Sequence, residues 1–212
     1  MIKSVLPIKY ADTFLAEYLT ISGGRKDYKT PISFIVYILK TEDKTILVDA
    51  GCQTMPGFEM SNFVGSVNAL KNNGIAPEEI TDVIITHAHH DHIECVKYFK
   101  NATIHIQEDE YKVEGNKYIP DYMNVNLFKD NFILYDCVKI QRISGHSIGS
   151  SIVEFEVDGQ KYVICGDECY TRKNIETKTP IGASIDINAS RGFIKKYANN
   201  KYKCLLCHDM TI

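Results

Sequence analysis

A run of histidines with one aspartate follows a short apolar segment near the middle of the chain. The run spans residues 87–92 and has the pattern H-x-H-x-D-H. The apolar residues 82–85 predict a buried strand that ends at Thr86, so the run begins where the backbone leaves a sheet. His87 and His89 are two positions apart and can point the same way only on extended or turning backbone. The segment therefore predicts a strand, a loop and a helix, with polar side chains collected at the end of a sheet.

The helix predicted after this run has one buried face. Asp91 and His92 stand at its expected start, and Ile93, Val96 and Phe99 have the spacing of a single helix face. Imidazole and carboxylate groups together suit first-row transition metals. A run of surface histidines that binds metal loosely is the alternative. The fixed alternation directly after a buried strand favours a specific metal site, with the remaining histidine at a spacer position.

The composition is that of an ordinary globular protein. The chain has 212 residues, 44% of them hydrophobic and 24% charged, which predicts one domain over residues 1–212. The net charge of −3 provides no bulk attraction for a phosphate backbone, so we expect no nucleic acid partner. Residues 1–7 are expected to be a first strand rather than a leader, and no stretch has membrane-spanning length. The seven cysteines lack framework spacing, which is typical of reduced thiols in the cytoplasm.

The pattern of strands and helices predicts an α/β fold with two mixed sheets packed face to face and covered by helices. Helices are expected over 61–73 and near 186–198, and Asp158-Gly159 predicts a type I′ hairpin turn. Residues 111–131 are expected to be irregular and rich in aromatic residues, either as a substrate lid or as a surface loop. Strands are expected at residues 31–40, 45–49, 82–86, 103–107, 132–135, 138–143, 151–157, 160–165 and 203–207.

Three more polar residues each lie just past a predicted strand: His146, Asp167 and His208. A single histidine after a strand is usually structural, and an aspartate after a glycine usually belongs to a turn. Combined with the central run, they make seven side chains of the chemical types that bind two metal ions. The seven candidate ligands are His87, His89, Asp91, His92, His146, Asp167 and His208.

In the order of these motifs, the sequence resembles the metallo-β-lactamase superfamily over essentially its whole length. The resemblance implies a four-layer αββα sandwich of two mixed β-sheets flanked by helices, with the site at one edge. The matching segments are Val48-Asp49-Ala50-Gly51, the H-x-H-x-D-H run, Gly145-His146, Gly166-Asp167 and His208.

Carried over to this sequence, the resemblance divides the candidate ligands between two divalent metal ions. Zinc is expected because the set contains no thiolate, although such a site also accepts iron or manganese. The implied ligands of the first ion are His87, His89 and His146, those of the second are Asp91, His92 and His208, and Asp167 bridges the two.

One segment resembles the N-acyl homoserine lactonases within this superfamily. Residues 167–174 place Tyr170 three positions after the bridging aspartate, as in these lactonases. Cys207-His208-Asp209 resembles their Gly-His-Asp, with cysteine in place of glycine. The chain is shorter than typical lactonases, and few residues separate Gly51 from the next expected helix, in a region that lactonases use to shape the acyl pocket. The resemblance is therefore more specific for the branch than for the substrate.

The activity implied is the hydrolysis of a small lactone or ester by a hydroxide that bridges the two metal ions. Tyr170 is the candidate donor to the oxyanion that forms at the carbonyl. Asp91 is the candidate carrier of the proton to the leaving alkoxide. The expected partner is therefore a small-molecule substrate.

Other activities of the superfamily stay open at this stage. A glyoxalase II-like thioester hydrolase would also suit the set, and a mononuclear-iron persulfide dioxygenase would use only His87, His146 and Asp167. Diiron flavoproteins have a carboxylate where this chain has His89, and nucleases usually carry extra domains or basic arms, so both are disfavoured. A non-catalytic binding module is disfavoured because all seven candidate ligands are present. The sequence leaves the oligomeric state open.

Overall fold

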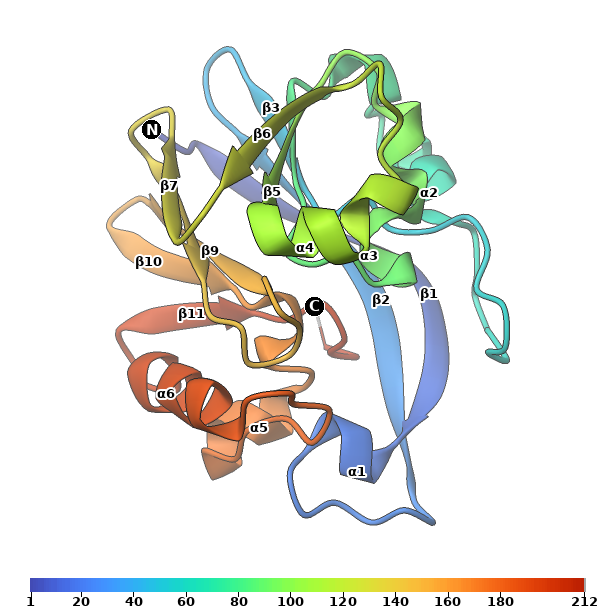
Figure 1. The fold of residues 1–212 in the computed structure, drawn as a ribbon, viewed down its shortest axis with the longest axis vertical. Helices are drawn as coiled ribbons and strands as arrows, with labels where there is room; N and C mark the ends of the chain where they lie inside the picture. Colours follow the sequence, from blue (N-terminus) through green and yellow to red (C-terminus); the bar gives the residue numbers. More distant parts are fainter. Residues whose placement is uncertain (212) are drawn as a thin grey trace.

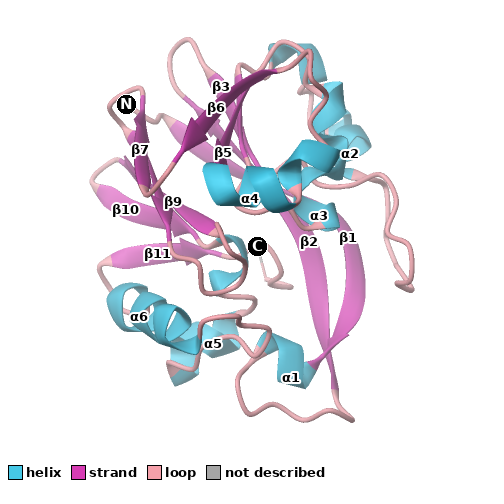
Figure 2. Cartoon of the chain, in the orientation of Figure 1, coloured by secondary structure: helices cyan, strands magenta, loops and turns pink. Residues whose placement is uncertain are grey.

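The computed structural model describes residues 1–211 and contains two β-sheets that pack against each other (Figures 1 and 2). Ile212, the last residue of the expected domain, lies outside the described residues. In the first sheet, six strands follow one another in chain order. The first two neighbouring pairs are antiparallel and the other three pairs are parallel. These strands are β1 (Ser4–Ala16), β2 (Lys29–Lys40), β3 (Thr45–Val48), β4 (Asp82–Ile84), β5 (Thr103–Gln107) and β6 (Asn124–Phe128).

The second sheet has five strands, and each strand pairs with the next one in the chain. All of its neighbouring pairs are antiparallel except the last two strands, which are parallel. The strands are β7 (Asn131–Leu134), β8 (Val138–Arg142), β9 (Ser151–Val157), β10 (Gln160–Ile164) and β11 (Tyr202–Leu205).

Helices lie on the outer faces of both sheets, as Figure 1 shows. The helices on the first sheet are α2 (Ser66–Asn72), α3 (His90–Ile93) and α4 (Glu108–Val113); those on the second are α5 (Arg172–Thr177) and α6 (Ile187–Tyr197); and α1 (Glu17–Thr20) lies between β1 and β2 in the chain.

Three buried apolar clusters separate the four layers. One lies between the first sheet and its helices and includes Leu70 and Phe99. The second lies between the two sheets, and the third includes Phe193 and Tyr197 of α6 against the second sheet. Burial of each such side chain contributes about 1.5–3 kcal/mol relative to its exposure. The expected αββα sandwich is confirmed.

Strand β2 shows why its sequence belongs in the middle of this sandwich. Its residues are apolar at nearly every position, as a strand buried on both faces requires. Phe34 and Val36 face the helices, whereas Ile35, Tyr37 and Leu39 face the second sheet. The period of two in a strand sends alternate side chains into different clusters.

The hairpin between β9 and β10 forms as its sequence predicts. Asp158 and Gly159 have φ angles of +49° and +78°. A type I′ turn needs positive φ at both central residues, and aspartate followed by glycine adopts this most easily.

The structure differs from the sequence-based expectation in several segments. The first strand, expected over residues 1–7, is β1 over Ser4–Ala16, and the short helices α1 and α5 were not expected. Helix α2 begins at Ser66 rather than 61, because Ser61 pairs with the backbone of Asp12 in β1 before the helix starts. The helix after the histidine run is one turn of α3 followed by a 3-10 helix, although its three apolar residues are buried as expected. Residues 111–131, expected to be irregular, include the end of α4 and the strand β6.

The parallel strands determine where polar side chains can meet. β3, β4 and β5 end at the same edge of the first sheet, and β10 and β11 end together in the second. Loops that leave the carboxyl ends of neighbouring parallel strands lie side by side. In the part of the chain that the structure describes, no helix is both long and apolar enough to cross a lipid bilayer.

Candidate metal centre

The seven candidate ligands all follow the carboxyl end of a strand. The histidine run follows β4, and His146 follows β8. Asp167 follows β10, and His208 follows β11. The structure brings these four segments together at one edge of the sandwich and groups their ligand atoms into two clusters.

The first cluster contains His87, His89, His146 and Asp167. Nδ1 of His89 lies 3.0 Å from Nε2 of His87 and 2.9 Å from Nε2 of His146. Three ring nitrogens therefore converge on one point from two different loops.

The second cluster contains Asp91, His92 and His208. Oδ2 of Asp91 lies 3.5 Å from Nε2 of His92 and 3.6 Å from Nε2 of His208. The two clusters together contain every ligand expected from the sequence.

The carboxylate of Asp167 lies between the clusters. Its Oδ1 is 3.3 Å from Nε2 of His92 and 3.2 Å from Nε2 of His208. Its Oδ2 is 3.4 Å from Nε2 of His146 and 3.7 Å from Nε2 of His87. Each oxygen thus faces one cluster, which is the arrangement that a bridging ligand requires.

These donors fit a pair of divalent metal ions. Nε2 of His92 and Oδ1 of Asp167 are buried and have no hydrogen-bond partner among residues 1–211. Unpaired buried polar atoms are costly unless another group satisfies them, and a cation would satisfy both. Zinc–nitrogen bonds of 2.0–2.1 Å in a tetrahedral site place neighbouring nitrogens about 3.3 Å apart, close to the separations found here.

The other ring nitrogens of the histidines are held by partners outside the clusters. Nδ1 of His146 donates to the carbonyl of Ala183 at 2.9 Å, and Nδ1 of His208 donates to the carbonyl of Ser33 at 2.9 Å. Nδ1 of His92 lies 2.8 Å from Oδ2 of Asp49. These contacts direct Nε2 toward the clusters and set the ring orientation, as outer partners of metal-binding histidines do.

Asp49 supports the candidate site, although the sequence analysis gave it no role of its own. Its carboxylate accepts hydrogen bonds from the backbone N–H of Thr86 at 2.8 Å and from the Thr86 hydroxyl at 2.9 Å, besides holding His92. It has a φ of +62°, which aspartate tolerates better than most residues. The available signal was an acidic residue directly after a buried strand.

Glu110 is a second such residue, and it connects two of the ligand loops. Its Oε1 accepts from the backbone N–H of Ala88 at 2.9 Å. Its Oε2 accepts from the hydroxyl of Ser147 at 2.9 Å and from the N–H of Gly149 at 2.7 Å. A buried carboxylate that holds three donors from both loops fixes the distance between their histidines.

Glu168 holds the His146 loop from the other side. Its Oε1 accepts from the backbone N–H groups of Gly145 at 2.9 Å and His146 at 3.1 Å, and from the Ser150 hydroxyl at 2.5 Å. Burial raises the pKa of the Glu168 carboxyl to about 7, although these hydrogen bonds act in the opposite direction. Gly145 is required here because a Cβ would collide with this carboxylate.

Burial and neighbouring charges shift the pKa values of several candidate ligands. Burial lowers the pKa of His87 and of His89, so both rings are neutral and able to bind a cation. Burial alone would raise the pKa of Asp167, but the histidines around it, His208 first, hold that pKa well below its usual value. For His92, the effect of Asp167 and its other carboxylate neighbours exceeds that of burial and raises the pKa. A cation binding there would displace a proton.

Tyr170 lies against both clusters. Its ring stacks on His208 with centroids 5.0 Å apart and meets the edge of His146 at 5.9 Å. Burial raises the pKa of its hydroxyl well above the usual value, so the group keeps its proton and can donate it in a hydrogen bond. The expected contact between Tyr170 and a substrate oxygen stays a prediction.

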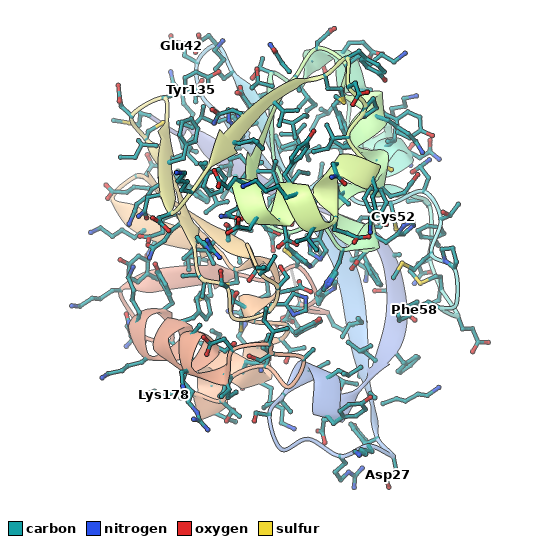
Figure 3. All side chains as sticks on the ribbon, in the orientation of Figure 1. Asp27, Glu42, Cys52, Phe58, Tyr135 and Lys178 are labelled. Carbon is teal, nitrogen blue, oxygen red and sulfur yellow. The ribbon has the colours of Figure 1, made fainter. Side chains whose placement is uncertain are left out.

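A cavity of about 270 Å³ opens onto the clusters and includes Tyr170 in its lining. Ligand side chains form one part of it, and an apolar wall forms the rest. Phe58 lies on the loop that projects from the body of the molecule after β3 (Figure 3). The wall consists of Leu15, Ile32, Phe34, Met55 and Phe58.

The two remaining histidines lie outside the clusters. His90, at the spacer position, is within hydrogen-bonding distance of the carbonyl of Thr54 at 2.9 Å and of the Tyr118 hydroxyl at 3.3 Å. Nε2 of His105 lies 2.9 Å from Oδ1 of Asp82, at the other end of the parallel strands.

Known proteins share both the sequence pattern and the fold. The family model of the metallo-beta-lactamase superfamily matches residues 33–207. An N-acyl homoserine lactonase of Bacillus thuringiensis is 28% identical over 187 residues, which cover 76% of this chain and 73% of that protein. A probable metallo-hydrolase of Methanocaldococcus jannaschii is 28% identical over 151 residues, covering 71% of this chain and 66% of that protein.

Solved structures agree with this assignment at the level of the fold. An N-acyl homoserine lactone hydrolase with N-hexanoyl-L-homoserine at its catalytic metal centre superposes with a TM-score of 0.86 at 22% identity, covering 99% of this chain and 94% of that one. A dizinc quorum-quenching lactonase superposes with a TM-score of 0.77 at 18% identity, covering 100% and 90%. By its sequence match over most of its length, the chain belongs to the metallo-beta-lactamase superfamily.

Proposed function

We propose that this chain binds two divalent metal ions and uses them to open a small lactone or ester. The comparisons and the clusters already describe the chain as a lactonase-like hydrolase of the metallo-beta-lactamase superfamily with a candidate His/Asp metal site. The proposal adds the number of ions, the residues that bind them and the class of substrate. It rests on the carboxylate of Asp167, whose two oxygens face two separate ligand clusters.

Two divalent ions at these clusters would supply an activated water near neutral pH and polarise the carbonyl of the substrate. Zinc is the first choice for a set of histidines and carboxylates without thiolate, and iron or manganese would also fit. Asp167 would hold both ions, because a carboxylate between two cations offsets their repulsion. The other six ligands would be His87, His89 and His146 for one ion and Asp91, His92 and His208 for the other.

Two side chains that line the cavity would act on the substrate itself. The Tyr170 hydroxyl keeps its proton and would donate a hydrogen bond to the oxyanion as charge develops there. Asp91 has a side chain that is 13% exposed, whereas those of His92 and His208 are almost fully buried. It is therefore the carboxylate of the second cluster that can reach the leaving oxygen and deliver a proton to it.

The substrate class is supported by the cavity and by the relatives. The apolar wall opposite the ligands suits a hydrocarbon part attached to the reacting carbonyl. Relatives at 28% identity are named N-acyl homoserine lactonases. We therefore propose a small lactone or ester as the partner and no nucleic acid, in keeping with the net charge of −3. The cysteine content supports a cytoplasmic location as part of the same proposal.

The test is elemental analysis of protein purified without chelators, followed by a substrate panel. We expect two metal ions per chain and faster hydrolysis of N-hexanoyl homoserine lactone than of a matched thioester. One iron ion with no second metal, together with oxidation of a persulfide, would instead identify a mononuclear-iron oxidoreductase. A preference for the thioester would indicate a glyoxalase II-like enzyme with the same ligands.

A further inference from the structure

Tyr10 is the extra residue of a β-bulge in β1. Lys9 pairs with Ile35 and Ala11 pairs with Phe34, so Tyr10 is left between two paired residues. Successive residues of a regular strand face opposite sides, but Tyr10 and Ala11 both pack in the apolar cluster between the first sheet and its helices. A bulge bends a strand and changes the direction in which a side chain points. Here the redirected side chain reaches the segment after β4.

The hydroxyl of Tyr10 donates to the backbone carbonyl of Asp91 at 2.8 Å. Tyr10 is 2% exposed, and its ring packs against those of Phe34 and Phe63 with centroids 5.8 Å and 6.4 Å away. Sγ of Cys52 lies 3.8 Å from the same hydroxyl, and sulfur is a weaker acceptor than a carbonyl oxygen. The proton of this buried hydroxyl is therefore directed at Asp91.

The carbonyl of Asp91 takes a side-chain donor because α3 ends after a single turn. In a continuous α-helix, the N–H of Cys95 would donate to this carbonyl. In the structure, the N–H of Cys95 donates to the carbonyl of Gly51 at 3.0 Å instead. A buried carbonyl without a donor is costly. Tyr10 thus replaces the helical donor and fixes the main chain at Asp91.

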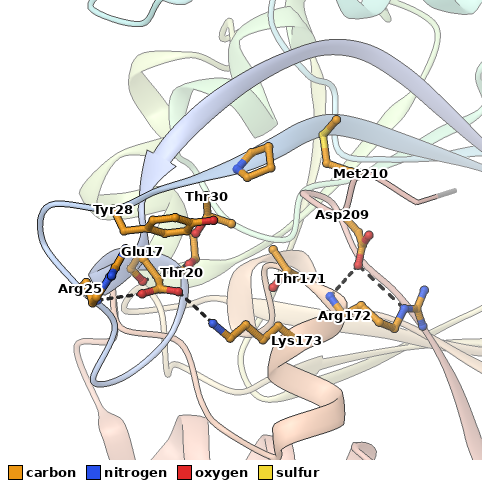
Figure 4. Close-up of a pocket in the computed structure, with 11 residues that line it drawn as sticks. Glu17, Thr20, Arg25, Tyr28, Thr30, Thr171, Arg172, Lys173, Asp209 and Met210 are labelled. Atoms are coloured by element: carbon orange, nitrogen blue, oxygen red, sulfur yellow. Dashed lines mark hydrogen bonds and ion pairs between the residues drawn. The ribbon is translucent and has the colours of Figure 1, made fainter.

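The other two ligands of the second cluster are held by different groups. His92 and His208 each have an outside partner for the second nitrogen of the ring. The segment of His208 is fixed further by Asp209, whose Oδ2 accepts from the backbone N–H of Arg172 at 2.6 Å (Figure 4). The removal of one tyrosine hydroxyl should therefore disturb the third ligand, Asp91, and leave both histidines in place.

We propose that Tyr10 is a positioning residue, whose hydroxyl holds the main chain at Asp91 so that the Asp91 carboxylate faces the second metal ion and the leaving oxygen of the substrate. This inference rests on the proposed function, in which Asp91 is both a metal ligand and the proton carrier. Oδ2 of Asp91 lies 3.5 Å and 3.6 Å from the ring nitrogens of the two histidines, so a small shift of its main chain would take it out of the cluster. Outer partners of metal ligands typically contribute about 10–100-fold to metal affinity or activity.

The test is Tyr10→Phe, which removes one hydroxyl and keeps the ring in its place. Zinc titration against a chelating dye should show about 10–100-fold weaker binding of one ion and unchanged binding of the other, because Tyr10 donates to a ligand of the second cluster. With enough zinc to fill both clusters, kcat on the best lactone or ester should fall about tenfold, since the proton carrier is misplaced. KM should stay unchanged, because Asp91 acts on the leaving oxygen only as the bond breaks.

Tyr197→Phe is the matched control, because it also removes the hydroxyl of a buried tyrosine. Tyr197 lies in α6, is fully buried and donates to Oε1 of Glu154 at 2.6 Å. Neither residue belongs to a ligand cluster or lines the metal-side cavity. Tyr197→Phe should lower the urea concentration at which the protein unfolds but keep both zinc affinities and kcat.

The outcomes separate this inference from the proposed function. If the natural chain binds two ions and Tyr10→Phe keeps both affinities and kcat, Tyr10 is a packing residue and the inference is wrong. Equal losses at both ions would also overturn it, because they would show a general effect on the fold. If no ester is hydrolysed, the zinc titration alone decides. A natural chain that binds fewer than two ions would overturn the proposed function, and this inference with it.

Discussion

At the scale of single residues, Tyr170 is held by the rings of His146 and His208, and not only by apolar packing. We expect Tyr170→Phe to lower turnover about 10²–10³-fold, because one donor to the developing oxyanion is lost. A metal ion that shares the oxyanion would bring the loss toward the lower value. The substrate affinity should change little, since the hydrogen bond strengthens only in the transition state. The measurement is kcat and KM on the best lactone or ester.

Tyr170→Phe should keep the fold and the metal content of the natural chain, because the Tyr170 hydroxyl is not a candidate ligand. Measuring both serves as an internal check. Tyr122→Phe is the control, since the side chain of Tyr122 is 66% exposed and lies outside the cavity lining. Unchanged turnover in Tyr170→Phe would reduce Tyr170 to a packing residue beside His208.

Asp167→Ala is expected to weaken the binding of both metal ions and to abolish activity. One side chain faces both clusters, so its removal takes a ligand from each and leaves two cations without the charge between them. Elemental analysis after gel filtration measures the loss. Asp91→Ala is the comparison, and it should mainly affect the second ion. Two ions and normal turnover in Asp167→Ala would show that the bridge lies elsewhere.

At the scale of elements, Glu110 joins the loop after β4 to the loop after β8. Glu110→Gln replaces one carboxylate oxygen by an amide NH2, so the donors of one of the two loops lose their acceptor and face another donor. We expect a loss of about 1–3 kcal/mol in the free energy of unfolding, with weaker metal retention because the two loops carry His87, His89 and His146. Urea unfolding and elemental analysis measure the two effects.

Glu108→Gln on the same helix is the matched control for Glu110→Gln. The carboxylate of Glu108 bonds to Lys112, whose side chain is 61% exposed, and makes no contact with either loop. If the two variants unfold at the same urea concentration, the hydrogen bonds of Glu110 do not contribute to the free energy of unfolding.

Asp82 connects strands at the opposite end of the first sheet. It accepts from the hydroxyls of Thr81 at 2.8 Å and Tyr135 at 2.9 Å and contacts His105 at 2.9 Å. Burial alone would raise its pKa, but these hydrogen bonds, His105 first, lower the pKa below its usual value. A carboxylate with a depressed pKa stabilises the folded state above the unfolded-state pKa of about 3.9, and this contribution is lost as the pH falls through the folded value.

Asp82→Asn should therefore destabilise the protein near neutral pH, by about 1–3 kcal/mol. The difference from the natural chain should shrink as the pH falls from about 4 through the lowered pKa of the folded carboxyl, because the unfolded chain takes up the proton first. Urea unfolding of metal-free protein at neutral and acidic pH measures this without interference from metal loss. A difference that is the same at both pH values would contradict the assigned role.

At the scale of the whole molecule, the ligand clusters join loops from both sheets. Metal binding should therefore stabilise the entire fold, because the clusters form only when both sheets are in place. A free ion at about a hundred times its dissociation constant contributes about 2.7 kcal/mol. We expect a chelator to lower the melting temperature by several degrees, with recovery when zinc is added back. A melting temperature that does not respond to the chelator would argue against a native metal centre.

Local patterns in the sequence were enough for much of the fold and for the candidate ligands. The nearly continuous apolar run of residues 31–40, the Asp158-Gly159 turn and the apolar run before the histidines each act over a few residues, so they can be interpreted without knowledge of distant contacts. The seven ligand-type side chains could be selected because each follows a predicted strand. Their grouping by family resemblance agrees with the clusters in the structure, while their binding of metal remains a prediction.

Other features depend on contacts between distant segments, and only the tertiary structure revealed them. Residues 124–128, inside a stretch expected to be irregular, form the strand β6, and all five pair with β5. Asp49 and Glu110 gain their roles from donors in loops far along the chain, as Asp167 gains its position from two clusters. A sequence pattern records the local conformation of the chain, whereas hydrogen bonds between distant loops exist only after the sheets have brought those loops together.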